Sequence, residues 1–73
     1  EWRSRDRVDG ARQYLTIRRN GEATWNGRGS IQGRWTNDGL RFRDGTYVRV
    51  DQDGRKRLRV DHPQWGRVEF EKR

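Results

Sequence analysis

The sequence contains no cysteine and a single histidine, His62, and these two scarcities restrict its chemistry. Without cysteine the chain can form no disulfide, no zinc–thiolate site and no thiol redox motif. A lone histidine before Pro63 is typical of a turn, and it leaves Ser4 and Ser30 without an evident base for nucleophilic catalysis. The ligand spacing of a metal site is also absent. We therefore predict no catalytic residues, no metal site and no cofactor.

Hydrophobic residues are scarce as well: they make up 27% of the chain, whereas charged residues make up 40%. No apolar run approaches the roughly 20 residues that a membrane-spanning helix needs. Such a composition is compatible with disorder, but four tryptophans and only one proline argue for a folded chain. With 73 residues, there is room for one domain with a small core.

Lysine is nearly absent among the 18 basic residues, since only Lys56 and Lys72 are lysines. The net charge is +7, which favours a polyanion as partner: nucleic acid, anionic lipid, an acidic polysaccharide or an acidic protein. Arginine adds a planar fork that binds phosphates and carboxylates and stacks on aromatic rings. A GC-rich coding bias would explain the arginine-for-lysine preference equally well, but it explains the positive net charge less well.

What the sequence has in abundance is alternation, most clearly between Gly39 and Lys72. There the Leu, Val and Phe residues all fall on even numbers and the arginines on odd ones. Successive side chains of a strand point to opposite faces, so the pattern predicts strands with one apolar and one cationic face. Asn-Gly and Asp-Gly turn signals separate these strands at short intervals. We predict an all-β fold, an antiparallel meander of about seven short strands that forms a small closed or half-open barrel.

The expected strands are residues 12–19, 22–27 and 30–36 and four more between residues 39 and 72. The segment 1–10 is polar apart from Trp2 and Val8, and forms either an edge strand or a frayed terminus. Residues 11–73 then make up a single barrel-like domain. An unpaired edge at the first or last strand would permit pairing between copies, so we expect a monomer or a weak homo-oligomer.

The inward-facing residues follow from the same alternation. They are expected to be Leu15, Ile17, Trp25, Ile31, Trp35, Leu40, Phe42, Val48, Val50, Leu58, Val60, Val68 and Phe70. Inward positions are odd up to Trp35 and even from Leu40 onward. The connection 36–39 must therefore shift the phase by one, through a bulge or a corner that bends the sheet.

Cross-strand pairs predict the registers of several hairpins. Around Asn20-Gly21, placing Ile17 opposite Ala23 brings Leu15 opposite Trp25. Near the C-terminus, placing Val60 opposite Val68 brings Arg59 opposite Glu69, Arg57 opposite Glu71 and Asp61 opposite Arg67. Complementary charges in one register make that pairing unlikely to be accidental.

The same reasoning applied to the central hairpins predicts a row of like charges. Phe42 placed opposite Val48, and Val50 opposite Leu58, would align Arg41, Arg49, Arg59 and Glu69 across the outer face. Like charges facing each other destabilise a sheet unless solvent, salt or a bound anion relieves them. Pairing with nearby carboxylates leaves Arg41, Arg43 and Arg49, beside Tyr47, as the least neutralised part of this face.

The candidate anion- or nucleic-acid-binding residues are Arg41, Arg43, Arg49, Arg59 and Tyr47. A tyrosine ring stacks on a base while neighbouring guanidinium groups hold phosphates. We therefore predict a non-catalytic module for an anionic partner, nucleic acid first, with salt-sensitive and weakly sequence-specific binding. The alternative is a solvated sheet face that binds nothing.

A resemblance to a known family rests on a repeated cadence of strand, turn, strand and Gly-x-Trp. The segments that carry it are Tyr14 to Trp25, Gly33-Arg-Trp35, Leu40-Arg-Phe42, Asp44-Gly-Thr-Tyr-Val48 and Arg57-Leu-Arg-Val60. They resemble the small lipocalin-like meander domains of bacterial proteins, over about residues 14–70. The resemblance implies a domain that is exported or lipid-anchored, and that is structural or holds a small apolar ligand against Trp25 and Trp35. The inward side chains are numerous and large enough to weigh against a cavity.

The sequence begins at Glu1 without a signal-like segment, so we expect a processed product or an excised domain. The residues themselves favour neither an exported, periplasmic location nor a cytoplasmic one.

Overall fold

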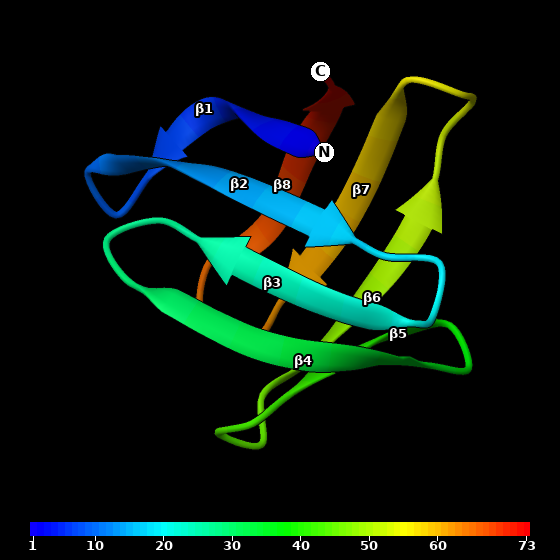
Figure 1. Ribbon diagram of the computed structural model, residues 1–73. Coiled ribbons are helices and arrows are strands. Elements are labelled where there is room, and N and C mark those ends of the chain that lie inside the picture. Colours follow the sequence, from blue (N-terminus) through cyan, green and yellow to red (C-terminus); the bar gives the residue numbers. More distant parts are fainter.

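The computed structural model describes residues 1–73 and contains eight antiparallel strands that close into a single barrel (Figure 1). The strands are β1 (Trp2–Val8), β2 (Ala11–Ile17), β3 (Glu22–Asn26), β4 (Ser30–Thr36), β5 (Gly39–Phe42), β6 (Tyr47–Gln52), β7 (Arg57–His62) and β8 (Gly66–Lys72). Each strand pairs with its neighbours in sequence, and β1 pairs with β8. The predicted all-β meander is confirmed, with eight strands in place of seven. No helix is present that could cross a membrane.

Strand β1 comes from the segment for which a strand and a frayed terminus were both expected, and the structure has the strand. Ser4 lies opposite Phe70 of β8, while the register with β2 shifts within residues 3–7. The Ser4 hydroxyl fills this irregularity: it accepts from the Gln13 backbone N–H at 2.8 Å and donates to the Asp6 carbonyl at 2.8 Å. Because β1 and β8 pair with each other, the free sheet edge expected at the first or last strand does not exist.

The core consists of Leu15, Ala23, Trp25, Leu40, Phe42, Val48, Val50, Leu58, Val60, Val68 and Phe70. All but Ala23 were predicted to face inward. Ile17 and Ile31 are only partly buried against this cluster. The prediction for Trp35 was wrong, since this residue is 40% exposed. Trp35 does lie opposite Leu40, but it sits near the end of β4, where its backbone N–H donates to the carbonyl of Gly21 in the β2–β3 turn.

The change of phase between β4 and β5 requires no bulge. The turn at Asn37-Asp38 pairs Trp35 directly with Leu40, so an odd position faces an even one. Asn37 takes the left-handed conformation, with φ of 39°, as two-residue hairpin turns require. The phase shift predicted at residues 36–39 is therefore present, but a tight turn produces it.

Two of the predicted registers are confirmed and two are wrong. Leu15 faces Trp25, and Val60 faces Val68, as expected. By contrast, Val48 lies opposite Leu40 rather than Phe42. The predicted pairing of Val50 with Leu58 is also wrong, because Val50 faces Val60.

Both errors arise because the centre of each turn lies one residue from its predicted position, at Asp44 in place of Gly45 and at Arg55 in place of Gly54. In the β5–β6 hairpin the Phe42 N–H donates to the Thr46 carbonyl at 2.8 Å. In the β6–β7 hairpin the Asp53 N–H donates to the Arg57 carbonyl at 2.9 Å. Each turn contains a left-handed glycine, Gly45 or Gly54, which is typical of short hairpin loops. A register displaced by two positions keeps every side chain on its own face, so the hydrophobic pattern could not detect the displacement.

Candidate anion-binding groove

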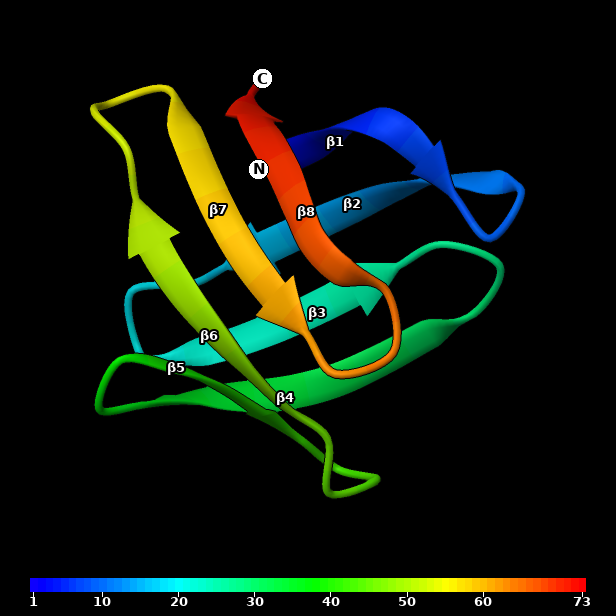
Figure 2. The same cartoon turned by 180° about the vertical axis from the view of Figure 1, so that it is seen from behind.

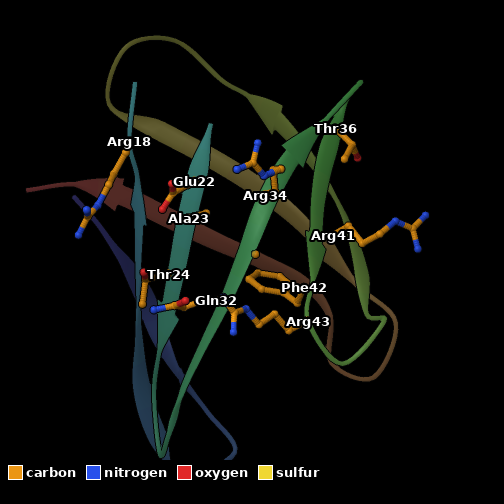
Figure 3. Close-up of a pocket in the computed structure, with 11 residues that line it drawn as sticks. Arg18, Glu22, Ala23, Thr24, Gln32, Arg34, Thr36, Arg41, Phe42 and Arg43 are labelled. Atoms are coloured by element: carbon orange, nitrogen blue, oxygen red, sulfur yellow. The ribbon is translucent and has the colours of Figure 1, made fainter. Parts of the chain in front are cut away.

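A groove of about 480 Å³ runs across the outside of strands β3, β4 and β5 (Figure 3). Its lining contains the arginines Arg18, Arg34, Arg41 and Arg43 and a single carboxylate, Glu22. We call these four the groove arginines. All four side chains are exposed. Between them lie three uncharged polar residues, Thr24, Gln32 and Thr36.

The sheet register brings the groove arginines together. Arg34 lies opposite Glu22 on β3 and opposite Arg41 on β5. Arg18 extends this row at the other side, because its backbone N–H donates to the Glu22 carbonyl at 2.8 Å. Tyr47 ends the row opposite Arg41. Neighbouring strands are about 4.8 Å apart, so three arginines lie within a few strand spacings of one another.

Arg43 joins the groove from the next row along the sheet. Its backbone N–H donates to the Gln32 carbonyl at 3.0 Å, just beyond the last residue of β5. The close approach of β4 to β5 depends on Gly33. A Cβ atom at Gly33 would lie 2.7 Å from the Arg41 carbonyl oxygen and 2.7 Å from the Phe42 ring. The absence of a side chain at this position therefore allows the close approach of the two strands that carry most of the groove.

None of the groove arginines has a carboxylate oxygen within 4 Å. All the ion pairs of the molecule lie elsewhere, at Arg5–Glu69, Arg49–Asp38, Arg49–Asp51, Arg67–Asp61 and Arg73–Glu1. Glu22 instead accepts a hydrogen bond from the Asn20 amide at 3.1 Å. The groove is thus a local excess of positive charge, and mutual repulsion between its arginines favours a bound anion.

Tyr47 supports the groove at the side of β6. The guanidinium carbon of Arg41 lies 5.6 Å from the centroid of the Tyr47 ring, within the range of a cation–π contact. The Tyr47 hydroxyl donates to the Asp38 carboxylate. This hydrogen bond raises the pKa of Tyr47 and lowers the pKa of Asp38. Tyr47 therefore contacts Arg41 through its ring and Asp38 through its hydroxyl.

The five predicted binding residues do not form one site. The structure places Arg41 and Arg43 in the groove, Tyr47 beside it, and Arg49 and Arg59 outside it. Arg49 was expected to be free, but its Nε lies 3.8 Å from Asp38 and 3.8 Å from Asp51. The predicted row of Arg41, Arg49 and Arg59 is wrong because both central registers are displaced.

Arg59 differs from the groove arginines in its surroundings. It lies between Asp51 on β6 and Glu69 on β8. The side chain is half-buried, and its Nε is buried without a hydrogen-bond partner. The two facing carboxylates offset part of the field of Arg59, although neither forms an ion pair with it within 4 Å.

Arg18 and Arg34 were missed by sequence reasoning, although a signal for both was available. The correct register of Ile17 with Ala23 already places Arg18 next to Glu22. A two-residue turn at Asn37-Asp38 would have placed Arg34 opposite Arg41.

Comparison of the chain with protein-family models, with curated proteins and with solved structures finds no match.

Proposed function

We propose that this protein is a non-catalytic domain that binds single-stranded nucleic acid through the groove on β3, β4 and β5. One observation carries the proposal: four exposed arginines share a groove in which none is paired with a carboxylate. Guanidinium groups bind phosphate oxygens in pairs, so phosphates would supply the counter-charge that the chain itself does not. The net charge of +7 adds long-range attraction.

The shape and chemistry of the groove favour a single strand over a duplex. A sheet face with a cationic groove is a common platform for single-stranded nucleic acid, whose backbone follows the positive charge. Thr24, Gln32 and Thr36 lie between the arginines and offer hydrogen bonds to sugars and exposed base edges. The chain contains no helix that could enter the major groove of a duplex.

The number of groove arginines determines the expected salt dependence of binding. If each groove arginine holds one phosphate, four counterions are released on binding. The logarithm of the association constant should then fall with the logarithm of the salt concentration with a slope of about −3. Because the contacts are to phosphates, the identity of most bases should have little effect on affinity.

The experiment is an anisotropy titration of a labelled oligothymidylate at several salt concentrations. The test variant carries Arg34→Gln and Arg41→Gln, and the matched control carries Arg5→Gln and Arg67→Gln, whose side chains are ion-paired far from the groove. Both variants lose the same net charge. We expect the groove variant to bind at least tenfold more weakly, with a slope shallower by about 1.4, and the control to change little. Equal losses in both variants, or no loss in the groove variant, would overturn the proposal.

A second candidate is a lipocalin-like domain that is structural or holds a small apolar ligand. The observation that favours it is the closed eight-stranded meander, an architecture shared by lipocalins. The barrel interior is filled, however, by side chains such as Leu15, Leu40 and Phe70, which have no exposed surface. Trp25 and Trp35 do not enclose a common space either, since one is buried in the core and the other is exposed. A change in tryptophan fluorescence with lipophilic ligands, independent of salt, would favour this candidate.

A further inference from the structure

One end of the barrel carries a cluster of aromatic side chains that the groove does not use. The turns that follow β1, β3, β5 and β7 all lie at this end (Figure 2). His62 stacks on Trp65, with ring centroids 4.1 Å apart and an interplanar angle of 17°. Trp25 lies 6.1 Å from Trp65 and 5.9 Å from Phe42. We call the cluster of Trp25, Phe42, His62 and Trp65 the aromatic mouth.

A hollow of about 190 Å³ opens on the aromatic mouth and is lined by all four of its rings. This volume is below the roughly 300 to 1,000 Å³ typical of pockets for drug-sized ligands, so it suits a single ring system. Its remaining lining includes the polar side chains of Asp44 and Gln64. The hollow therefore combines flat apolar walls with a polar edge.

The loop between β7 and β8 builds this hollow in a defined way. The Nδ1 atom of His62 accepts hydrogen bonds from the backbone N–H groups of Gln64 and Trp65, at 3.1 and 3.3 Å. Two donors at Nδ1 place the proton of the neutral ring on Nε2. Burial lowers the pKa of His62, so near neutral pH the ring is uncharged. The Trp65 indole N–H forms no hydrogen bond within the chain.

The hollow borders the groove at one residue. Phe42 lines both spaces, and the adjacent residues Arg43 and Asp44 line one each. Because Arg43 and Asp44 are adjacent, a strand whose phosphate is held by Arg43 would have a neighbouring base close to the aromatic mouth. Asp44 is held by a hydrogen bond from the Thr46 backbone N–H at 2.9 Å, which lowers the pKa of its carboxyl.

We propose that this hollow binds one nucleobase, stacked against the aromatic mouth with its polar edge on Asp44 and Gln64. The inference rests on the proposed function where the base belongs to a bound strand, but the same chemistry admits a free nucleoside. An ionised carboxylate only accepts hydrogen bonds. Guanine offers such an acceptor an amino group and a neighbouring ring N–H, whereas thymine has no amino group. Guanine should therefore be preferred over thymine.

The test compares oligothymidylate with the same oligomer carrying one guanine, or one abasic site, at a central position. If one base stacks on an aromatic ring, the guanine oligomer should bind with at least about fivefold higher affinity than the abasic oligomer. Asp44→Asn keeps an oxygen for the Thr46 N–H, so it should fold normally and lose most of the preference for guanine over thymine. Trp65→Leu should remove the gain in affinity from guanine without changing the salt slope. Trp35→Leu, at the opposite end of the barrel, should leave both the gain and the salt slope unchanged.

The outcomes separate this inference from the proposed function. If the Arg34 and Arg41 substitutions lower the affinity for all oligomers by the same factor and keep the order of their affinities, the groove proposal and the base-binding hollow are both supported. If they have no effect, the groove proposal fails. If guanine, thymine and abasic oligomers bind equally well to the native chain, the hollow does not bind a base.

A nuclear magnetic resonance titration identifies the source of the base. A shift of the Trp65 indole N–H with guanosine alone shows that the hollow takes a free nucleoside. A shift with the guanine oligomer alone shows that the strand must deliver the base. No shift with either would overturn the inference.

Discussion

The outer face of β3 to β5 and the outer face of β6 to β8 are both rich in arginine, yet their charges are arranged differently. On β6 to β8 the rows alternate in sign: Arg49 faces Asp61, which faces Arg67, and Asp51 faces Arg59, which faces Glu69. We call this the paired face. In the groove, by contrast, the row of Arg34 and Arg41 meets one carboxylate, Glu22, and no ion pair.

The comparison teaches that register, more than composition, decides which arginines are available to a partner. Exposed ion pairs contribute little to stability, typically about 0–1 kcal/mol. Their larger effect here is on the electrostatic potential, because a carboxylate opposite each arginine cancels the field that would attract an anion. We therefore expect affinity to fall when a carboxylate is added to the groove and to rise when one is removed from the paired face.

The largest expected effect comes from breaking the strand contact under the groove. Gly33→Ala places a Cβ atom 2.7 Å from the Arg41 carbonyl oxygen, so β4 and β5 must move apart. We expect a loss of about 1–3 kcal/mol in the free energy of unfolding, measured by urea denaturation, and at least a tenfold loss of oligonucleotide affinity. Gly29→Ala is the control, because a Cβ atom there meets nothing within 4 Å. Native affinity in a destabilised Gly33→Ala chain would mean that the β4–β5 contact does not organise the site.

A smaller effect is expected from making the groove resemble the paired face. Gln32→Glu introduces a carboxylate next to Arg43, whose backbone N–H donates to the Gln32 carbonyl. We expect several-fold weaker binding, with a salt slope shallower by about 0.7 for one lost phosphate contact. Gln52→Glu at the end of β6 changes the net charge equally outside the groove. If both substitutions weaken binding to the same degree, net charge and not the groove controls affinity.

The converse change opens the paired face. Asp61→Asn removes the partner of Arg67 and the residue opposite Arg49. We expect a gain in affinity of about two- to threefold at low salt and a slope steeper by up to about 0.7, again by anisotropy titration. Asp53→Asn, in a turn and outside every ion pair, adds the same charge as a control. A larger gain from Asp53→Asn than from Asp61→Asn would contradict the role given to the paired face.

Much of the fold was predictable from the sequence because alternation and turn signals are local. They identified the barrel class and nearly all the core. Trp35 was misplaced because alternation reports the direction of a side chain but not whether another element covers it. Ser4 and Gln13 were missed because their burial depends on hydrogen bonds between residues that are close only in the folded barrel, such as the one from the Trp25 indole to Gln13.

The site was less predictable because a register displaced by two positions is invisible to the hydrophobic pattern. Charge pairing contained the missing information. The true register sets Arg49 opposite Asp61 and Asp51 opposite Arg59, whereas the predicted one set Arg49 opposite Arg59. Applying the charge criterion to every hairpin, as it was applied to β7 and β8, would have favoured the observed arrangement and removed Arg49 from the site.

The smallest expected effect concerns the boundary between the two faces, where Tyr47 supports Arg41 and binds Asp38. Their hydrogen bond lowers the pKa of Asp38 below 3.8 and raises the pKa of Tyr47 above 10.0. The lowered pKa of Asp38 stabilises the fold above about pH 3.8, and this contribution is lost as the pH falls through the folded-state value. For Tyr47 the contribution is present below about pH 10 and is lost as the pH rises through its folded-state value.

Tyr47→Phe separates these two roles, because it removes the hydroxyl and keeps the ring. We expect the pKa of Asp38 to rise toward 3.8 in a carboxyl NMR titration, while the pKa of Asp44, which the Thr46 N–H lowers, stays unchanged. Oligonucleotide affinity near neutral pH should change by less than about twofold, since the Arg41 cation–π contact survives. An unchanged Asp38 pKa would show that Arg49, 3.8 Å away, controls this carboxylate. A large loss of affinity would instead mean that the hydroxyl, through Asp38, orders the groove as well as the paired face.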